Sequence, residues 1–223
     1  MKKKIIIIGI IVLLIAGGIT TFFVLKNKNK ECNSQATRFK KLYEKYNSVN
    51  ITYNKKKYKL QNLEIEKDNP MASISKEDIY NKLEKGTNII FFSSPKDYTS
   101  REMLQVLLEV AKGNNCDTIY YFDIDKLNKN YSKEIDVELY DKITGKLDSN
   151  INNYFKDTDK KKIENGTIVF SKDGEIKKVI ENISDDYEYG NKITKKQKQS
   201  LKTDLNEGFS NISGGVCEIR QQC

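Results

Sequence analysis

The segment from residue 88 to residue 124 constrains the fold of this chain most, because it places one amphipathic stretch between two apolar ones. Residues 88–92 are apolar and β-prone, which is typical of a strand buried on both faces. The next stretch has the 3.6-residue apolar spacing of a helix, at Met103, Leu104, Leu107, Leu108 and Ala111. Residues 118–124 form a second apolar strand. This order predicts a βαβ unit with parallel strands and a right-handed crossover.

Two residues compete for the start of the helix in this unit. Thr99-Ser100-Arg101-Glu102 has the spacing of a capping box, which places the N-cap at Thr99. Asp97 is the alternative cap, because the backbone N–H groups and the helix dipole favour a carboxylate at a helix N-terminus. Gly113 and the two asparagines after it predict the end of the helix.

The residues before this unit predict two helices and a hairpin. Residues 39–46 have helical apolar spacing. Residues 51–60 predict a β-hairpin, and Leu63 and Ile65 predict an extension of its second arm. A helix is expected to begin at the start signal of Ser75 and to stop at Gly86.

The residues after this unit complete the expected fold. Residues 126–165 are rich in Asn, Asp and Lys and predict a partly helical insertion with a turn at Gly145. Residues 167–180 predict an antiparallel hairpin around an Asp-Gly turn. Thr194 predicts the start of the last helix. Together these elements predict an α/β fold with a central mixed β-sheet flanked by helices.

Several stretches of the sequence are similar, in the same order, to those of a known family. They are Asp68-Asn69-Pro70-Met71, Phe91-Phe92, Leu107-Leu108-Glu109-Val110-Ala111, Asp117-Thr118-Ile119-Tyr120-Tyr121 with Asp123, Gly166-Thr167-Ile168-Val169-Phe170 and Asp173-Gly174-Glu175. With these stretches the βαβ unit resembles the first half of a thioredoxin fold. The region from Phe39 to Cys223 resembles the membrane-attached, thioredoxin-like proteins of low-GC Gram-positive bacteria known as bacteriocin-transport accessory proteins. The resemblance implies a thioredoxin-like domain and a protein or peptide partner outside the cell.

The chain departs from this family at its active site. Aligned on the shared Glu-Val-Ala, the Cys-x-x-Cys of the family falls on Asp97, Tyr98, Thr99 and Ser100, and no Cys-x-x-Cys occurs anywhere in the sequence. Thiol–disulfide exchange needs an activated thiolate and a resolving thiol, which hydroxyl and carboxyl groups cannot replace. Gly166 stands where the resemblance implies a cis-proline, and a trans bond is expected there. The resemblance therefore implies a degenerate site without dithiol catalysis.

The first 37 residues predict a membrane anchor and a stalk. Residues 5–25 are uncharged and long enough to cross a bilayer, after the lysines within residues 1–4. Residues 26–37 are polar and predict a stalk before a domain at 38–223. A cleaved signal peptide is one alternative and a lipoprotein at Cys32 is another. The expected topology is a single pass with the N-terminus inside the cell and the domain outside.

Four cysteines, Cys32, Cys116, Cys217 and Cys223, predict at least one disulfide if the domain is extracytoplasmic. The preferred pair is Cys217 with Cys223, because the loop between them is short and similar chains also end in paired cysteines. This pair is expected to be a structural staple, and a relocated redox pair is the alternative. Cys116 is expected to be a small core residue.

Composition narrows the function further. The chain has no histidine, which excludes His-based triads and His-containing metal sites, and no cofactor or metal motif is found. Six lysines up to Lys30 account for most of the net charge of +8, so contact with lipid headgroups is expected rather than nucleic-acid binding. Three functions are consistent with the sequence. They are an envelope or secretion accessory module that binds a partner, an oxidoreductase using the C-terminal cysteines, and a surface spacer.

Overall fold

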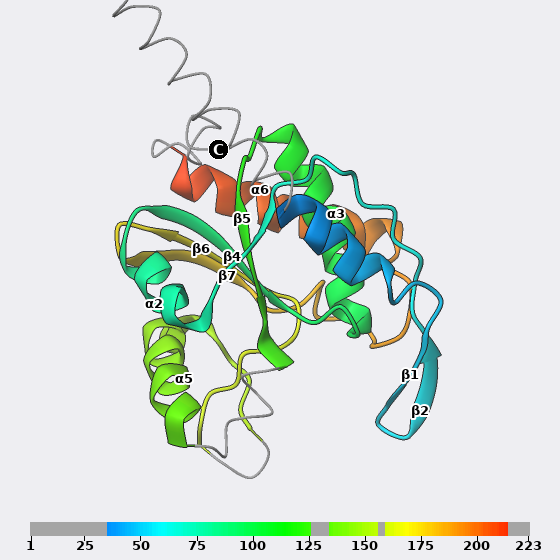
Figure 1. The fold of residues 1–223 in the computed structure, drawn as a ribbon, viewed down its shortest axis with the longest axis horizontal. Coiled ribbons are helices and arrows are strands. Elements are labelled where there is room, and N and C mark those ends of the chain that lie inside the picture. Colours follow the sequence, from blue (N-terminus) through cyan, green and yellow to red (C-terminus); the bar gives the residue numbers. More distant parts are fainter. Residues whose placement is uncertain (1–34, 126–133, 156–158, 214–223) are drawn as a thin grey trace, which may run out of the picture.

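The computed structural model describes residues 35–125, 134–155 and 159–213. A five-stranded sheet runs through its centre in the order β3-β5-β4-β6-β7 (Figure 1). The strands are β3 (Met71–Ser73), β4 (Thr87–Ser93), β5 (Ile119–Asp123), β6 (Thr167–Lys172) and β7 (Glu175–Ile180). Strands β3, β5 and β4 are parallel, β6 is antiparallel to β4, and β7 is antiparallel to β6. The predicted mixed sheet and its parallel βαβ strands are therefore confirmed.

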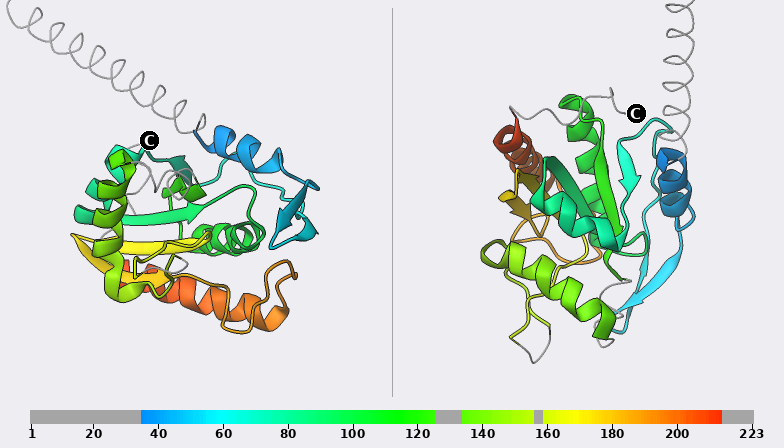
Figure 2. Two further views of the ribbon diagram at one scale, coloured as in Figure 1. Left: turned by 90° about the horizontal axis from the view of Figure 1, so that it is seen from below. Right: turned by 60° about the vertical axis from the view of Figure 1, so that its left-hand side comes forward.

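Helices cover both faces of this sheet, as predicted (Figures 1 and 2). The helices are residues 35–44, α2 (Lys76–Glu84), α3 (Tyr98–Gly113), α5 (Glu134–Leu147) and α6 (Lys195–Ile212), with a short 3-10 turn, η1 (Asp148–Asn150). Ser75 caps α2 and Thr194 caps α6 with a capping box. Both predicted starts are confirmed, and so is a helix inside the predicted insertion.

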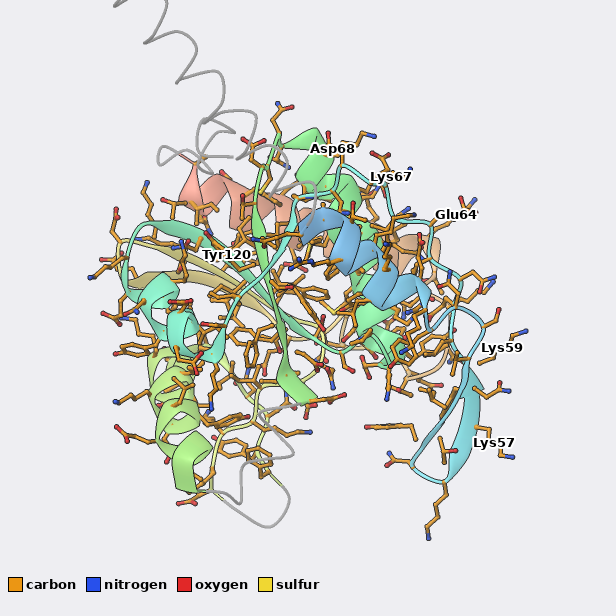
Figure 3. The ribbon with its side chains drawn as sticks, in the orientation of Figure 1. Lys57, Lys59, Glu64, Lys67, Asp68 and Tyr120 are labelled. Carbon is orange, nitrogen blue, oxygen red and sulfur yellow. The ribbon has the colours of Figure 1, made fainter. Side chains whose placement is uncertain are left out.

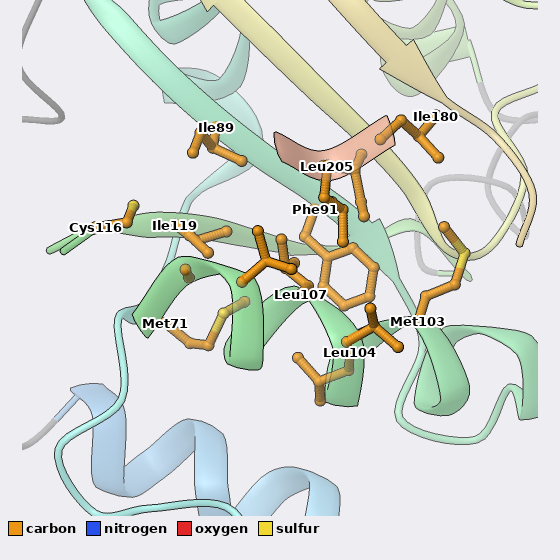
Figure 4. Close-up of a cluster of buried hydrophobic side chains, with 14 of the residues drawn as sticks. Met71, Ile89, Phe91, Met103, Leu104, Leu107, Cys116, Ile119, Ile180 and Leu205 are labelled. Atoms are coloured by element: carbon orange, nitrogen blue, oxygen red, sulfur yellow. The ribbon is translucent and has the colours of Figure 1, made fainter. Parts of the chain in front are cut away.

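The apolar run of β4 is buried because two cores meet on it. Ile89 and Phe91 belong to the core that β4 shares with residues 35–44, α3 and α6 (Figure 4). Ile90 and Phe92 belong to the second core, shared with α2 and α5. Alternate side chains of a strand point to opposite faces, so a strand covered on both faces needs apolar residues throughout.

The hairpin of β1 (Asn50–Tyr53) and β2 (Lys56–Lys59) forms a separate two-stranded sheet that stands away from the central one (Figure 1). The prediction that Leu63 and Ile65 extend its second arm is wrong, because β2 ends at Lys59. Both side chains are buried, but the backbone at these positions bonds to side chains of residues 40–47 instead of a strand.

Two local predictions need correction. The N-cap of α3 is Asp97 and not Thr99, because the Asp97 side chain accepts the Ser100 N–H and helical residues begin at Tyr98. The predicted turn at Gly145 is wrong, since Gly145 lies inside α5. A glycine in a helix costs about 1 kcal/mol relative to alanine, and burial of Ile143 and Leu147 on either side holds the helix.

The predicted membrane span at residues 5–25, the lysines before it and the stalk up to residue 34 lie outside the described residues. Among the residues that the structure describes, no helix is both long and apolar enough to cross a bilayer.

Candidate functional site

The start of α3 lies directly after β4, where the sequence analysis placed the degenerate site. Asp97 accepts the backbone N–H of Ser100 at 2.6 Å, which caps the helix. The pKa of the Asp97 carboxyl is raised to about 6, because burial and the nearby Asp125 carboxylate outweigh the hydrogen bonds from Ser100 and Tyr189, which lower it. A carboxyl group, and no thiol, therefore occupies the first position of the aligned pair.

Gly166 lies against this helix start, as the resemblance implies. A Cβ atom added to Gly166 would lie 2.8 Å from Met103 Sδ and 3.8 Å from the Ser100 N and Cα atoms. The Gly166 N–H donates to the Phe92 carbonyl at 2.9 Å, and the residue has a φ of +100°. The described peptide bonds are trans. The structure therefore places Gly166 beside Ser100, two of the five positions of the expected degenerate site.

Buried polar atoms flank Gly166 on both sides. Asn165 Oδ1 and Thr167 Oγ1 are buried and accept or donate no hydrogen bond within the described residues. Asn165 Nδ2 donates to Asp125 Oδ1 at 2.9 Å, which links this loop to the carboxylate beside Asp97. Because buried polar atoms are normally satisfied, these two oxygens mark a place suited to a polar ligand atom or water.

Tyrosines gather over the start of α3 from three separate parts of the chain. Tyr189 stacks on Tyr53 of the hairpin with ring centroids 4.0 Å apart, and it meets Tyr58 edge-to-face at 5.3 Å. The ring of Tyr98 lies 6.0 Å from that of Tyr189. The Tyr189 hydroxyl accepts the Tyr98 N–H at 3.3 Å and so occupies a free donor of the helix. We call Tyr53, Tyr58, Tyr98 and Tyr189 the tyrosine cluster.

Arg101 is a site residue whose role the sequence did not reveal. Its side chain has no exposed surface. Nη1 donates to the carbonyls of Tyr43 and Pro95 at 2.8 and 3.0 Å, and Nη2 donates to Asn47 Oδ1 and the Gln61 carbonyl at 2.6 and 2.7 Å. Burial lowers the pKa of the guanidinium to about 10. All four acceptors are neutral, and three of them lie at least 40 residues away in the sequence, so no local pattern marks this residue.

The cysteines do not replace the missing thiols near this site within the described residues. Cys116 is buried before β5, and its thiol donates to the Thr118 carbonyl at 3.5 Å. It follows the C-terminal end of α3, and Figure 4 shows it at the far end of the core from Met103. A helix of this length spans roughly 24 Å, so Cys116 cannot resolve a bond formed at Asp97. Cys32, Cys217 and Cys223 lie outside the described residues.

Chemically, this site can accept a proton at Asp97 and present aromatic faces, but it holds no sulfur nucleophile. No group of three or more Cys, Asp or Glu side chains in the described part of the chain could hold a metal ion.

The sequence was also compared with known proteins. No protein-family model matches the chain. No curated protein matches it either.

Proposed function

We propose that this chain is a membrane-anchored, extracytoplasmic protein with a thioredoxin-like domain that binds a partner and has no dithiol catalysis. The expected anchor is residues 5–25, which meet membrane lipid, and the role is that of a binding or accessory module in secretion or the cell envelope. The parallel βαβ half, the antiparallel hairpin β6–β7 and the terminal α6 support a thioredoxin-like fold.

The observation that carries this proposal is the chemistry at the start of α3. Asp97 and Ser100 stand at both positions of the expected cysteine pair, and the Asp97 carboxyl and the Tyr189 hydroxyl already occupy the first N–H groups of the helix. A substrate disulfide would therefore find no thiolate there, and the N–H groups of Tyr98 and Ser100 are already bonded.

The tyrosine cluster supports binding as the remaining role. Tyr53 is 45% exposed although its ring stacks on Tyr189, so an aromatic face remains open to solvent. Tyrosine is enriched at protein interfaces because it offers a large contact area at a low cost in side-chain entropy. The two buried oxygens of Asn165 and Thr167 lie beside Gly166 and suit a bound water behind this surface.

An insulin-reduction assay on the full chain in detergent tests the loss of catalysis. We expect the natural chain to be no faster than a variant in which serine replaces Cys32, Cys116, Cys217 and Cys223. The double variant Asp97→Cys with Ser100→Cys restores the aligned pair and should gain activity, because the fold already places both positions at a helix N-terminus. Natural activity that disappears in the cysteine-free variant would instead support the C-terminal redox pair.

Cross-linking tests the binding role and separates it from a mere spacer. A photoreactive phenylalanine analogue at position 53 should capture an envelope protein, while the same analogue at exposed Asp173 should not. Equal labelling at the two positions would contradict a binding role for the tyrosine cluster.

A further inference from the structure

The segment that follows β2 is strand-like but has no neighbouring strand. Leu63 and Ile65 are 2% and 4% exposed, whereas Asn62, Glu64 and Glu66 are exposed. This alternation is typical of an extended chain with one buried face. Glu64, Lys67 and Asp68 point outward along this segment in Figure 3.

One edge of this segment is fully used. The N–H groups of Leu63 and Ile65 donate to Asn47 Oδ1 and Glu44 Oε1 at 3.0 and 2.9 Å. Their carbonyls accept from Asn47 Nδ2 and Lys40 Nζ at 2.9 and 2.5 Å. The side chains of residues 40–47 therefore pair with the segment in the way that a neighbouring strand would.

The opposite edge is open. In an extended chain the backbone groups of successive residues point to opposite sides, so those of Asn62 and Glu64 point away from Glu44 and Asn47. Within residues 35–125, 134–155 and 159–213, no hydrogen bond reaches the backbone N–H or carbonyl of either residue. Such an edge is a template for pairing with another chain.

A groove of about 1100 Å³ lies beside this edge. Residues 62–66 form one wall, Lys198 of α6 lies on another, and the outer face of α3 contributes Leu104, Gln105 and Leu108. Lys40, Glu44 and Asn47 do not line it, which places it on the open side of the segment. We call it the α3 groove.

The α3 groove is acidic although the chain is basic. Five carboxylates and only two lysines line it, which gives a net charge of −3 in a chain of +8. Glu66 pairs with Lys112, and Glu109 pairs with both Lys198 and Lys202, so the charges of these two carboxylates are compensated. The groove therefore favours an occupant that carries positive charge.

We propose that the α3 groove binds an extended, lysine- or arginine-containing segment of another protein by β-strand addition to Asn62 and Glu64. The partner's backbone would supply the missing hydrogen bonds, and its basic side chains would meet the carboxylates of the groove. This inference deepens the proposed function by naming a class of partner. It uses no residue of the Asp97 site, so the two proposals can fail separately.

The test measures binding of a blocked heptapeptide of alternating lysine and valine to the full chain in detergent. An otherwise identical peptide with glutamate in place of lysine should bind at least about tenfold more weakly, because charge and groove no longer match. Two further peptides carry N-methyl groups on alternate residues, one on the odd positions and one on the even positions. N-methylation keeps the charge but removes backbone donors. One of the two methylated peptides should also lose about tenfold in affinity, since each lost hydrogen bond costs roughly that factor.

Two variants of the groove separate backbone pairing from charge. Glu64→Pro removes one N–H of the open edge and should weaken peptide binding about tenfold, whereas Glu64→Gln keeps that N–H and should weaken it less. A proline is tolerated on a strand edge that faces solvent, and circular dichroism checks that the variant folds. The methylated peptides also test the contribution of backbone hydrogen bonds, without changing the protein.

Residue-resolved amide hydrogen exchange reports the geometry. The amides of Asn62 and Glu64 should exchange rapidly without peptide and slowly with it, while those of Leu63 and Ile65 stay protected in both states. This alternating response would support the proposal. It would be overturned by peptide binding that ignores N-methylation, by equal binding of the acidic peptide, or by no binding. Protection of Asn62 and Glu64 before any peptide is added would overturn it too, because the chain itself would then fill the groove.

Discussion

The start of α3 and the outer face of the same helix differ in how their backbone groups are used. At the start, the Asp97 carboxyl, the Tyr189 hydroxyl and the buried Arg101 guanidinium make hydrogen bonds that close the site. Along the outer face, the α3 groove keeps an open edge at Asn62 and Glu64. The start of one helix is therefore closed by internal hydrogen bonds, while a backbone edge beside the outer face of the same helix stays open. The predictions below test this contrast by stability, from the largest effect to the smallest.

Arg101→Leu should cause the largest loss, about 4 kcal/mol in the free energy of unfolding, because four hydrogen bonds of a buried guanidinium are lost at once and the Pro95 and Gln61 carbonyls are left without their donor. Urea denaturation of the domain measures this loss. Arg38→Leu is the matched control, because Arg38 is exposed, and should change stability by less than about 0.5 kcal/mol. Similar losses in the two variants would show that Arg101 does not hold the closed site together.

Gly166→Ala should cost about 2 kcal/mol, because the new Cβ would lie 2.8 Å from Met103 Sδ and φ is +100°. Gly113→Ala is the control at the other end of α3, where an added Cβ meets nothing within 4 Å. We expect that control to be neutral or slightly stabilising. Thermal unfolding followed by circular dichroism compares the two, and equal melting temperatures would refute tight packing at the closed site.

Asp97 should make stability depend on pH. Its pKa is raised to about 6 in the folded state, so the folded chain binds more protons than the unfolded one between about pH 4 and pH 6. Stability should therefore fall by about 2 kcal/mol as pH rises through this range, since each pKa unit corresponds to about 1.4 kcal/mol.

Asp97→Asn should abolish this fall and be slightly more stable at pH 7, because asparagine is also a good N-cap and carries no charge. Urea midpoints at pH 4 and pH 7 test this, with Asp173→Asn, at an exposed turn, as control. A variant that is less stable at pH 7 would mean that the ionised cap is favourable despite its burial.

Glu64→Gln should have the smallest effect on stability, within about 0.5 kcal/mol, because the side chain is exposed on the open edge. The same variant should weaken binding of the basic heptapeptide. If Glu64→Gln changed the free energy of unfolding by more than it changed the free energy of peptide binding, the contrast between the closed helix start and the open groove would be lost.

The central layer of the fold was predictable because its signals are local. The unbroken apolar run at 88–92 requires a strand covered on both faces. Ser75 and Thr194 mark helix starts because each side chain accepts the backbone N–H of the residue three positions later. The choice between Asp97 and Thr99 was harder, since both have cap-forming side chains two residues apart. Contacts with Tyr189, which is remote in sequence, accompany the Asp97 cap, and no local pattern could supply them.

The functional regions were less predictable because they depend on distant partners. Arg101 is buried by oxygens of Tyr43, Asn47, Gln61 and Pro95, and an arginine in a charged chain normally indicates an exposed surface. Leu63 and Ile65 were wrongly predicted to extend the hairpin, because alternation of side chains does not reveal whether a strand or side chains will pair with the backbone. The edge at Asn62 and Glu64 is open because side chains, and not a second strand, pair with this segment.

Arg101 also has a mechanical consequence. Its guanidinium ties the region around Tyr43 and Asn47 to the Gln61 backbone and to the loop before α3. A pull applied at residue 35 would reach these four bonds through the helix of residues 35–44. If the chain is tethered through its N-terminus, tension from the tether would be shared between this clamp and the contacts that Tyr43 makes with Ser93 of β4 and Tyr121 of β5.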